Sequence, residues 1–307
     1  MPDKQNVFYH YTSVDALYNI VSNRTFWLAN AKSSNDKTEG NFSIEEFCDI
    51  LSDVKHNIAS PSICNAIDLF KENCKELHKS RSFYILSMTT MKDNLTHWER
   101  YACGKNGVAI ALSENLFKTL DNKIFSLFRK DVIFDFNVIY AKEKCINTII
   151  EHLTETFDMF KTHQNADIIL RSTLSRMFYR ISYCIKNNSF KDENECRILL
   201  DSDEMKNRLY ALQKGIPLGE KYATEIIKKQ YFNLLSCLSL EQTYFAPIRG
   251  EIRSLHHLNL SEIWDSDLIP EIMLGPNCPQ SVEELRAFLD ANGLQNTKIT
   301  ESKIPLR

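Results

Sequence analysis

The stretch from residue 83 to residue 112 reads FYILSMTTMKDNLTHWERYACGKNGVAIAL and decides the class of fold. Its two ends, FYILSM at 83–88 and GVAIAL at 107–112, are short apolar runs, so each predicts a β-strand. The segment between them carries Trp98 and Tyr101, which are three residues apart and share one face of a short helix. A strand, a short helix and a second strand in close succession predict a fold that mixes both kinds of element.

The same patterns continue on both sides of this stretch. Thr12-x-x-Asp15 and Ser43-x-x-Glu46 each predict a capping box at the start of a helix. Beyond them, apolar residues recur at helical spacing and β-prone runs end in polar loops. The expected strands are 7–11, 25–29, 83–88, 107–112, 132–140, 196–200, 243–248, 268–274 and 298–305, and the expected helices are 14–21, 44–54, 62–78, one around 98–101, two within 142–186, 203–240 and 281–291.

Short strands interrupted by helical segments predict an α+β fold with a mostly antiparallel sheet core. No internal repeat, low-complexity tract or Pro/Gly-rich linker divides the chain, so we expect a single domain over residues 1–307. Helical insertions are expected at about 142–186 and 203–240. The patterns G-x-G-x-x-G and G-x-x-x-x-G-K-[ST] are both absent, which excludes the two commonest phosphate-binding loops.

The composition is that of a chain with a buried core and no strong overall charge. The 307 residues are 43% hydrophobic and 25% charged with a net charge of −3, so a polynucleotide would need a local basic patch. The polar start MPDKQNV and the lack of a long apolar run predict a cytoplasmic protein with no membrane partner. Neither C-x-x-C nor H-x-x-x-H occurs, so we expect reduced thiols and no metal site.

Two polar groups near the N-terminus could bind an anion or a sugar. The motif YHYT at 9–12 ends a predicted strand just before a helix, whose free N–H groups suit a pyrophosphate or a carboxylate. The alternative is an ordinary capped turn with a buried His10. Asn35 and Asp36 lie in the loop after the second strand, where they either bind ribose hydroxyls or hydrogen-bond their own backbone.

A third group follows the FYILSM strand. Ser87 and Thr89 lie at its end, where hydroxyls can position a carboxylate. Trp98 and Tyr101 could stack a planar ring, or they could fill the core as large aromatic residues usually do.

The fourth group is ENECR at 193–197, next to an apolar strand. In a strand, residues i, i+2 and i+4 share a face, so we expect Glu193, Glu195 and Arg197 to project together. Such a group can be a surface ion network worth about 0 to 1 kcal/mol, or a catalytic acid beside a residue that positions substrate.

A basic and aromatic stretch lies on the predicted helix near 171–186. Arg176, Arg180 and Tyr183 belong to it, and single-stranded nucleic acid binds to such a combination of charge and stacking. The alternative is an amphipathic helix whose basic face is solvated.

Six short motifs follow one another in a fixed order. They are YHYT at 9–12, NDxxE at 35–39, SxT at 87–89, WxxY followed by GVAI at 98–110, ExExR at 193–197, and a tail with IMLGP and ESKIPLR. This order resembles a widespread bacterial domain family of unknown function whose members often occur near phage-defence genes. The resemblance covers most of the chain apart from 142–186 and 203–260.

Three of these motifs are also similar to motifs of ADP-ribosyltransferases. YHYT is similar to their opening motif, SMT at 87–89 to their S-T-S strand, and ENE at 193–195 to their E-x-E. The resemblance implies a sheet core of the ADP-ribosyltransferase type and NAD as cofactor. It implies that Glu195 stabilises positive charge on the ribose and that Glu193 positions or deprotonates the acceptor. The residues implied to bind NAD are His10, Tyr11, Thr12, Asn35, Asp36, Ser87, Thr89, Trp98, Tyr101 and Arg197.

We therefore expect an ADP-ribosyltransferase-like toxin or phage-defence effector that transfers ADP-ribose from NAD to a macromolecule. RNA or single-stranded DNA is the expected acceptor ahead of protein, and an antitoxin protein is an expected partner. The alternatives are an NAD glycohydrolase, which hands the ribose to water, and a non-catalytic sensor or interaction module on the same fold.

Overall fold

The computed structural model describes residues 7–33, 42–74, 82–114, 133–203, 206, 243–248 and 250–305. The chain divides into two compact units. The sheet unit consists of Met1–Asn30, Tyr84–Phe136 and Glu193–Arg307, and the helical unit consists of Ala31–Phe83 and Asn137–Asp192. Because each unit is assembled from segments that are distant in sequence, local composition carries no sign of the boundary.

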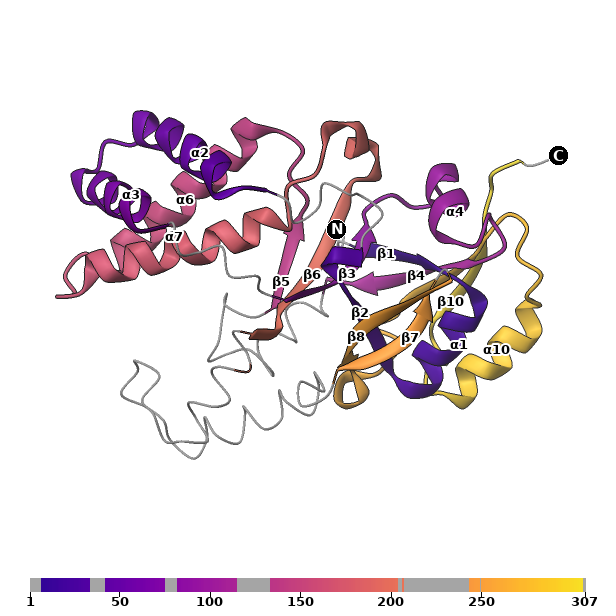
Figure 1. The fold of residues 1–307 in the computed structure, drawn as a ribbon. Coiled ribbons are helices and arrows are strands. Elements are labelled where there is room, and N and C mark those ends of the chain that lie inside the picture. Colours follow the sequence, from indigo (N-terminus) through magenta and orange to yellow (C-terminus); the bar gives the residue numbers. More distant parts are fainter. Residues whose placement is uncertain are drawn as a thin grey trace, which may run out of the picture. The chain divides into compact units, whose positions relative to one another are not determined.

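The strands form one mixed and mostly antiparallel sheet (Figure 1), which confirms the expected α+β class. Its order in the described part of the chain is β10-β9-β4-β1-β3-β2-β8-β7, and β6 pairs with β3 and with β5. Only β10, which runs parallel to β9, departs from the antiparallel pairings along this path. The strands are β1 (Val7–Thr12), β2 (Thr25–Asn30), β3 (Phe83–Thr89), β4 (Val108–Ser113), β5 (Ile133–Asn137), β6 (Glu195–Asp201), β7 (Tyr244–Ile248), β8 (Glu251–Asn259), β9 (Glu271–Leu274) and β10 (Lys298–Glu301).

Different helices cover the two faces of this sheet. Helices α1 (Val14–Asn23) and α10 (Val282–Ala291) bury Leu17 and Leu285 in a core that includes Ile110 of β4. Helix α4 (Leu95–Tyr101) buries Trp98 against Ala109 of the same strand. Since Ala109 and Ile110 are consecutive in a strand, they point to opposite faces, and α4 therefore lies on the face opposite to α1 and α10.

Gly107, which begins the GVAI motif, marks a close approach of two backbones. A Cβ at this position would collide with the carbonyl oxygen of Thr12 and would lie 3.0 Å from the backbone of Ala102. Glycine is therefore required here by space, because β4 must begin against the end of β1.

The helical unit contains α2 (Ile44–Asn57), α3 (Pro61–Asn73), α6 (Lys142–Phe160) and α7 (Ala166–Ser182). Phe47 of α2 lies at its centre, with ring centroids 5.7 Å from Phe70 of α3 and 5.5 Å from Phe178 of α7. The predicted capping box at Ser43 and Glu46 is confirmed, because both of its hydrogen bonds are present. The two helices expected within 142–186 are confirmed as well.

The capping box predicted at Thr12 and Asp15 is wrong. Thr12 is the last residue of β1 and pairs with Val108. Its neighbour Ser13 caps α1 instead, since the Ser13 hydroxyl accepts a hydrogen bond from the Ala16 N–H at 3.0 Å. The strand pairing keeps Thr12 in the sheet and shifts the helix start by one residue.

Other expected boundaries also change. The helix expected at 62–78 ends at Asn73, the strand expected at 268–274 begins at Glu271, and the last strand ends at Glu301. Strand β8 was not expected, because its sequence EIRSLHHLN is polar and becomes a strand only between β2 and β7. Most of the helical insertion expected at 203–240 lies outside the described residues.

Candidate functional site

Glu193 is buried where the chain enters β6 and is held by two side chains of α4. Its Oε1 accepts a hydrogen bond from the Tyr101 hydroxyl at 2.6 Å and one from Nη1 of Arg100 at 3.3 Å. The Glu193 side chain is 6% exposed and that of Arg100 is 54% exposed. A hydroxyl and a cation therefore fix this carboxylate just beneath the surface of the sheet unit.

The backbone of Glu193 is anchored to both β3 and α4. Its carbonyl oxygen accepts hydrogen bonds from the Thr89 hydroxyl at 2.7 Å and from Nε2 of His97 at 3.1 Å. Asn194 follows with a φ of 41°, in the left-handed region, and β6 begins only at Glu195. The expected strand alternation therefore does not extend to Glu193, which is directed to α4 instead.

Glu195 and Arg197 form a buried bidentate ion pair. Arg197 donates from Nε to Oε1 at 2.7 Å and from Nη2 to Oε2 at 2.8 Å. The two side chains are 8% and 1% exposed. Taking two charges out of water costs roughly several kcal/mol per ion, so such a pair persists only with close geometry.

Aromatic rings from β1 and α4 pack on the same face of the sheet as these acids. The Tyr11 ring lies edge-on to Trp98 at 4.7 Å and 5.1 Å from the His97 ring, which lies 5.8 Å from Tyr101. Trp98 is fully buried, whereas Tyr101 is partly exposed. Burial raises the pKa of Tyr11 to about 12, so its hydroxyl stays protonated and donates to the carbonyl of Met91 at 3.0 Å.

His10 projects from the other face of β1. Because Tyr11 faces α4, the alternation of the strand turns His10 towards the α1 side, where its ring lies 5.9 Å from Phe26. Its Nδ1 donates to the backbone carbonyl of Ser87 at 2.9 Å, and not to the Ser87 hydroxyl. The structure thus brings His10 into contact with β3 but does not place its ring on the face that carries Glu193.

Two more of the predicted NAD-binding residues, Thr12 and Ser87, lie in the described part of the chain. Thr12 is half-buried, and its carbonyl faces Gly107. The Ser87 side chain is exposed. Asn35 and Asp36 lie outside the described residues.

The predicted nucleic-acid residues belong to the helical unit. Arg176 of α7 donates to the hydroxyl of Thr173 at 3.0 Å, and Arg180 lies partly exposed in the last turn of the same helix. The Tyr183 ring is buried 4.4 Å from that of Phe83. A nucleic-acid base stacks on an exposed ring, so this tyrosine presents no face to one in the structure. The burial of the Tyr183 ring agrees with the alternative interpretation, an amphipathic helix that does not bind nucleic acid.

Three further residues support the site and were missed from the sequence. Arg100 binds Glu193, and His97 is fixed between the Glu193 carbonyl and Oδ1 of Asn94, the N-cap of α4. Asp93 accepts hydrogen bonds from Trp98 Nε1 at 2.9 Å and from the backbone N–H of Lys303 at 2.8 Å. Their signal was the run D-N-L-T-H-W-E-R-Y at 93–101, in which a capping Asn marks a helix start.

Among the described residues, no group of three or more His, Cys, Asp or Glu side chains is arranged to hold a metal ion. Within the same part of the chain, no helix has both the length and the apolar character needed to cross a membrane.

Comparison with known protein families matches residues 97–198 to a family described as a protein of unknown function, DUF2971. The match begins within α4 and ends within β6, so it spans both the Arg100 and Tyr101 pair and the two acids. It covers less than half of the chain. No curated protein and no solved structure matches the chain.

Proposed function

We propose that the protein is an ADP-ribosyltransferase-like enzyme that transfers the ADP-ribose of NAD to a macromolecular acceptor. Two facts support the proposal. The motif YHYT lies in β1, SMT lies in β3, and ENE lies where the chain enters β6. Strands β1 and β6 both pair with β3. Two neighbouring buried acids, Glu193 and Glu195, each contact a different arginine, and this observation carries the proposal. Buried charge is costly, and sites where it gathers are candidates for chemistry.

The chemical groups around Glu193 are of the kinds that bind the parts of NAD. A carboxylate accepts hydrogen bonds from ribose hydroxyls, and the exposed Arg100 guanidinium suits the oxygens of a pyrophosphate. The partly exposed Tyr101 ring suits the planar nicotinamide, with Trp98 supporting it from the core. His10 projects from the opposite face of β1 and is not part of this proposed NAD site.

The chemistry that we assign to the acids follows from the charge that NAD cleavage creates. When the glycosidic bond breaks, its electron pair leaves with nicotinamide and positive charge builds on the ribose. A carboxylate that faces this carbon stabilises the charge, and Glu195 is assigned to that role. The nucleophile of the acceptor then bonds to the same carbon and gives its proton to Glu193. Arg197 is a positioning residue that fixes the Glu195 carboxylate.

The first experiment measures nicotinamide release from NAD by the purified full chain and by Glu195→Gln. We expect a loss of about 100-fold or more, the effect of removing one group that stabilises transition-state charge. Glu271→Gln is the matched control, because Glu271 is also an ion-paired carboxylate of the sheet unit, bound to Lys92 at 2.8 Å. Nicotinamide release that is unchanged in Glu195→Gln would contradict the proposal.

A second variant separates lost chemistry from lost folding. Glu195→Gln leaves Arg197 buried without its carboxylate, so the double variant Glu195→Gln with Arg197→Met removes that charge as well. We expect it to fold and to release no nicotinamide. NAD labelled in the adenylate phosphate then identifies the acceptor: label on RNA, DNA or protein indicates a transferase, and free ADP-ribose indicates an NAD glycohydrolase.

One observation favours a second candidate, a non-catalytic sensor or interaction module on the same fold. Both oxygens of Glu195 are already engaged by Arg197, an arrangement that also serves a purely structural role. Calorimetry with NAD distinguishes the two candidates, because a module without the NAD site gives no heat of binding. The enzyme is expected to bind NAD saturably, and more weakly after Arg100→Met.

A further inference from the structure

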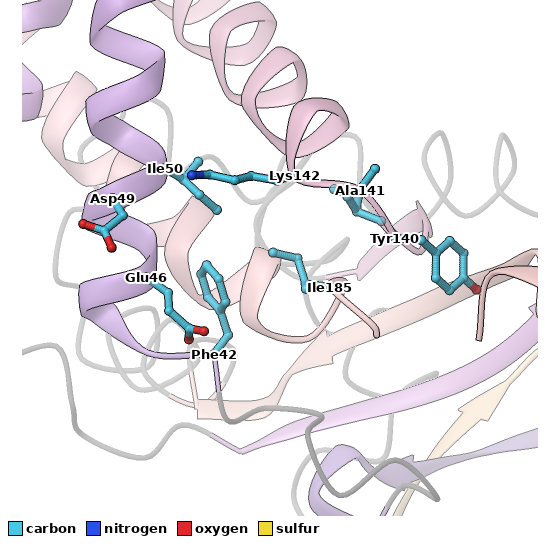
Figure 2. Close-up of a pocket in the computed structure, with 9 residues that line it drawn as sticks. Phe42, Glu46, Asp49, Ile50, Tyr140, Ala141, Lys142 and Ile185 are labelled. Carbon is cyan, nitrogen blue, oxygen red and sulfur yellow. The ribbon is translucent and has the colours of Figure 1, made fainter. Parts of the chain in front are cut away.

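A cavity of about 300 Å³ lies within the helical unit. The first two turns of α2 and the start of α6 line it (Figure 2). Ile139 and Ile185, which form a β-bridge, also line it. All of its lining residues belong to this one unit, so the cavity is complete without the sheet unit. None of the residues assigned to NAD lines it, and the proposed function leaves it unexplained.

The walls of the cavity are apolar and form part of the packed core. Ile50 and Ile139 are 4% and 7% exposed. Phe42 packs edge-on against Phe47, with ring centroids 6.4 Å apart. Figure 2 shows Phe42 and Ile185 between α2 and the start of α6, where an occupant would contact them. Such walls suit an apolar ring or chain.

Three charged side chains lie at the rim, two acids from α2 and one lysine from α6 (Figure 2). Nζ of Lys142 is paired with Oδ2 of Asp53 at 2.7 Å, so its charge is already balanced. This bond raises the pKa of Lys142 and lowers that of Asp53. Glu46 accepts a hydrogen bond from the Ser43 N–H, which leaves its negative charge in place, and Asp49 adds a second. The rim therefore carries an excess of two negative charges.

The opposing influence is the positive ends of the α2 and α6 dipoles, because both helices begin at the cavity. Each helix start carries about half a positive charge, so together they supply about one. Two full negative charges at Glu46 and Asp49 exceed this positive charge, so the cavity favours a cation over an anion.

We infer that the cavity binds a small amphiphilic cation, an organic amine or guanidine with an apolar body. The body lies against Phe42, Ile50 and Ile185, and the cationic group faces Asp49 and Glu46. A volume of about 300 Å³ is at the lower end of ligand pockets, so the body is limited to roughly one or two rings.

The test is ligand-observed NMR and calorimetry on the full chain with tryptamine, phenethylamine and benzamidine. Each is compared with an anion of similar body, namely indole-3-propionate, 3-phenylpropionate and benzoate. We expect saturable binding of at least one cation, no binding of the anions, and weaker binding as salt rises. Failure of all three cations to bind saturably, or equal binding of cations and anions, would overturn the inference.

Two charge reversals on the same helix locate the site. Asp49→Lys is expected to weaken binding of the cation by up to about fivefold, the scale of one exposed ion pair. Glu45→Lys is the matched control, because Glu45 is also exposed on α2 but does not line the cavity. Ala141→Leu fills the cavity from the α6 side without a change of charge and is expected to abolish binding. Equal weakening by both reversals, or unchanged binding in Ala141→Leu, would also overturn it.

Discussion

One ion pair of the sheet unit and one of the helical unit differ sharply in exposure. In the sheet unit, Glu195 and Arg197 pair with 8% and 1% of their side chains exposed. In the helical unit, Lys55 and Asp68 pair with 40% and 50% exposed. Water screens the second pair and leaves the first unscreened, so the first pair is harder to assemble and more damaging to break. The comparison teaches that the buried pair fixes the arrangement around it, whereas the exposed pair contributes little.

The largest expected effect comes from breaking the buried pair. Arg197→Met leaves Glu195 as a buried charge without its bidentate partner and should lower the free energy of unfolding by about 3 to 5 kcal/mol. Lys55→Met, which breaks the exposed pair, should lower it by about 0 to 1 kcal/mol. Urea denaturation of the two variants measures both values. Equal losses of stability in the two variants would mean that burial does not make the Glu195–Arg197 pair more important than the exposed pair.

A smaller effect is expected where Tyr101 meets Glu193. Tyr101→Phe removes the hydroxyl that donates to Oε1 at 2.6 Å, and a hydrogen bond to a charged group is worth about 1.5 to 3 kcal/mol. Tyr18→Phe is the control, because Tyr18 is 59% exposed and its change should stay within about 0.5 kcal/mol. Thermal unfolding compares them. A Tyr101→Phe variant as stable as the control would show that Glu193 does not depend on this contact.

The smallest effect concerns pH. Burial lowers the pKa of His97 and of His10, in each case against a hydrogen bond that raises it. Below about pH 6.5 the unfolded chain therefore binds protons that the folded chain does not, and stability falls as pH drops towards the folded pKa. Each group contributes a slope of at most about 1.4 kcal/mol per pH unit. Above this window the contribution is constant.

Denaturation at pH 7.5, 6.5 and 5.5 measures this slope. We expect it to be shallower in His97→Gln than in the unchanged chain. His163→Gln, at an exposed position of the helical unit, should leave the slope unaltered. If His97→Gln and His163→Gln lose stability equally as the pH falls, His97 is not the source of the slope.

Local signals in the sequence predicted most elements. The Ser43 capping box and the helical spacing of Phe47 placed α2, because both depend on residues within one or two turns. The capping rule gave a wrong prediction at Thr12, because the long-range pairing of Thr12 with Val108 decided its conformation. Strand β8 escaped prediction for a related reason: its polar sequence takes strand form through pairing with β2 and β7.

The candidate site was predicted in part. Alternation correctly placed Glu195 and Arg197 on one face, and their contact follows from the strand geometry of β6. The partners of Glu193 were not predictable, because Asn194 interrupts the strand and Tyr101 comes from a helix far away in the chain. Strand alternation implied that His10 and Tyr11 point to opposite faces of the sheet. Which face His10 takes was settled only by the structure, in which Tyr11 faces α4.

The sequence by itself determined the α+β class, the strands and helices of strong periodicity, and the identity of the charged residues near β6. These depend on contacts between residues close in the chain. Only the tertiary structure decided which charges are buried, which partners neutralise them, and that Phe42, Asp49 and Ile185 line one cavity. The reason is physical: burial and pairing depend on which distant segments pack together, and that choice is made by the whole core at once.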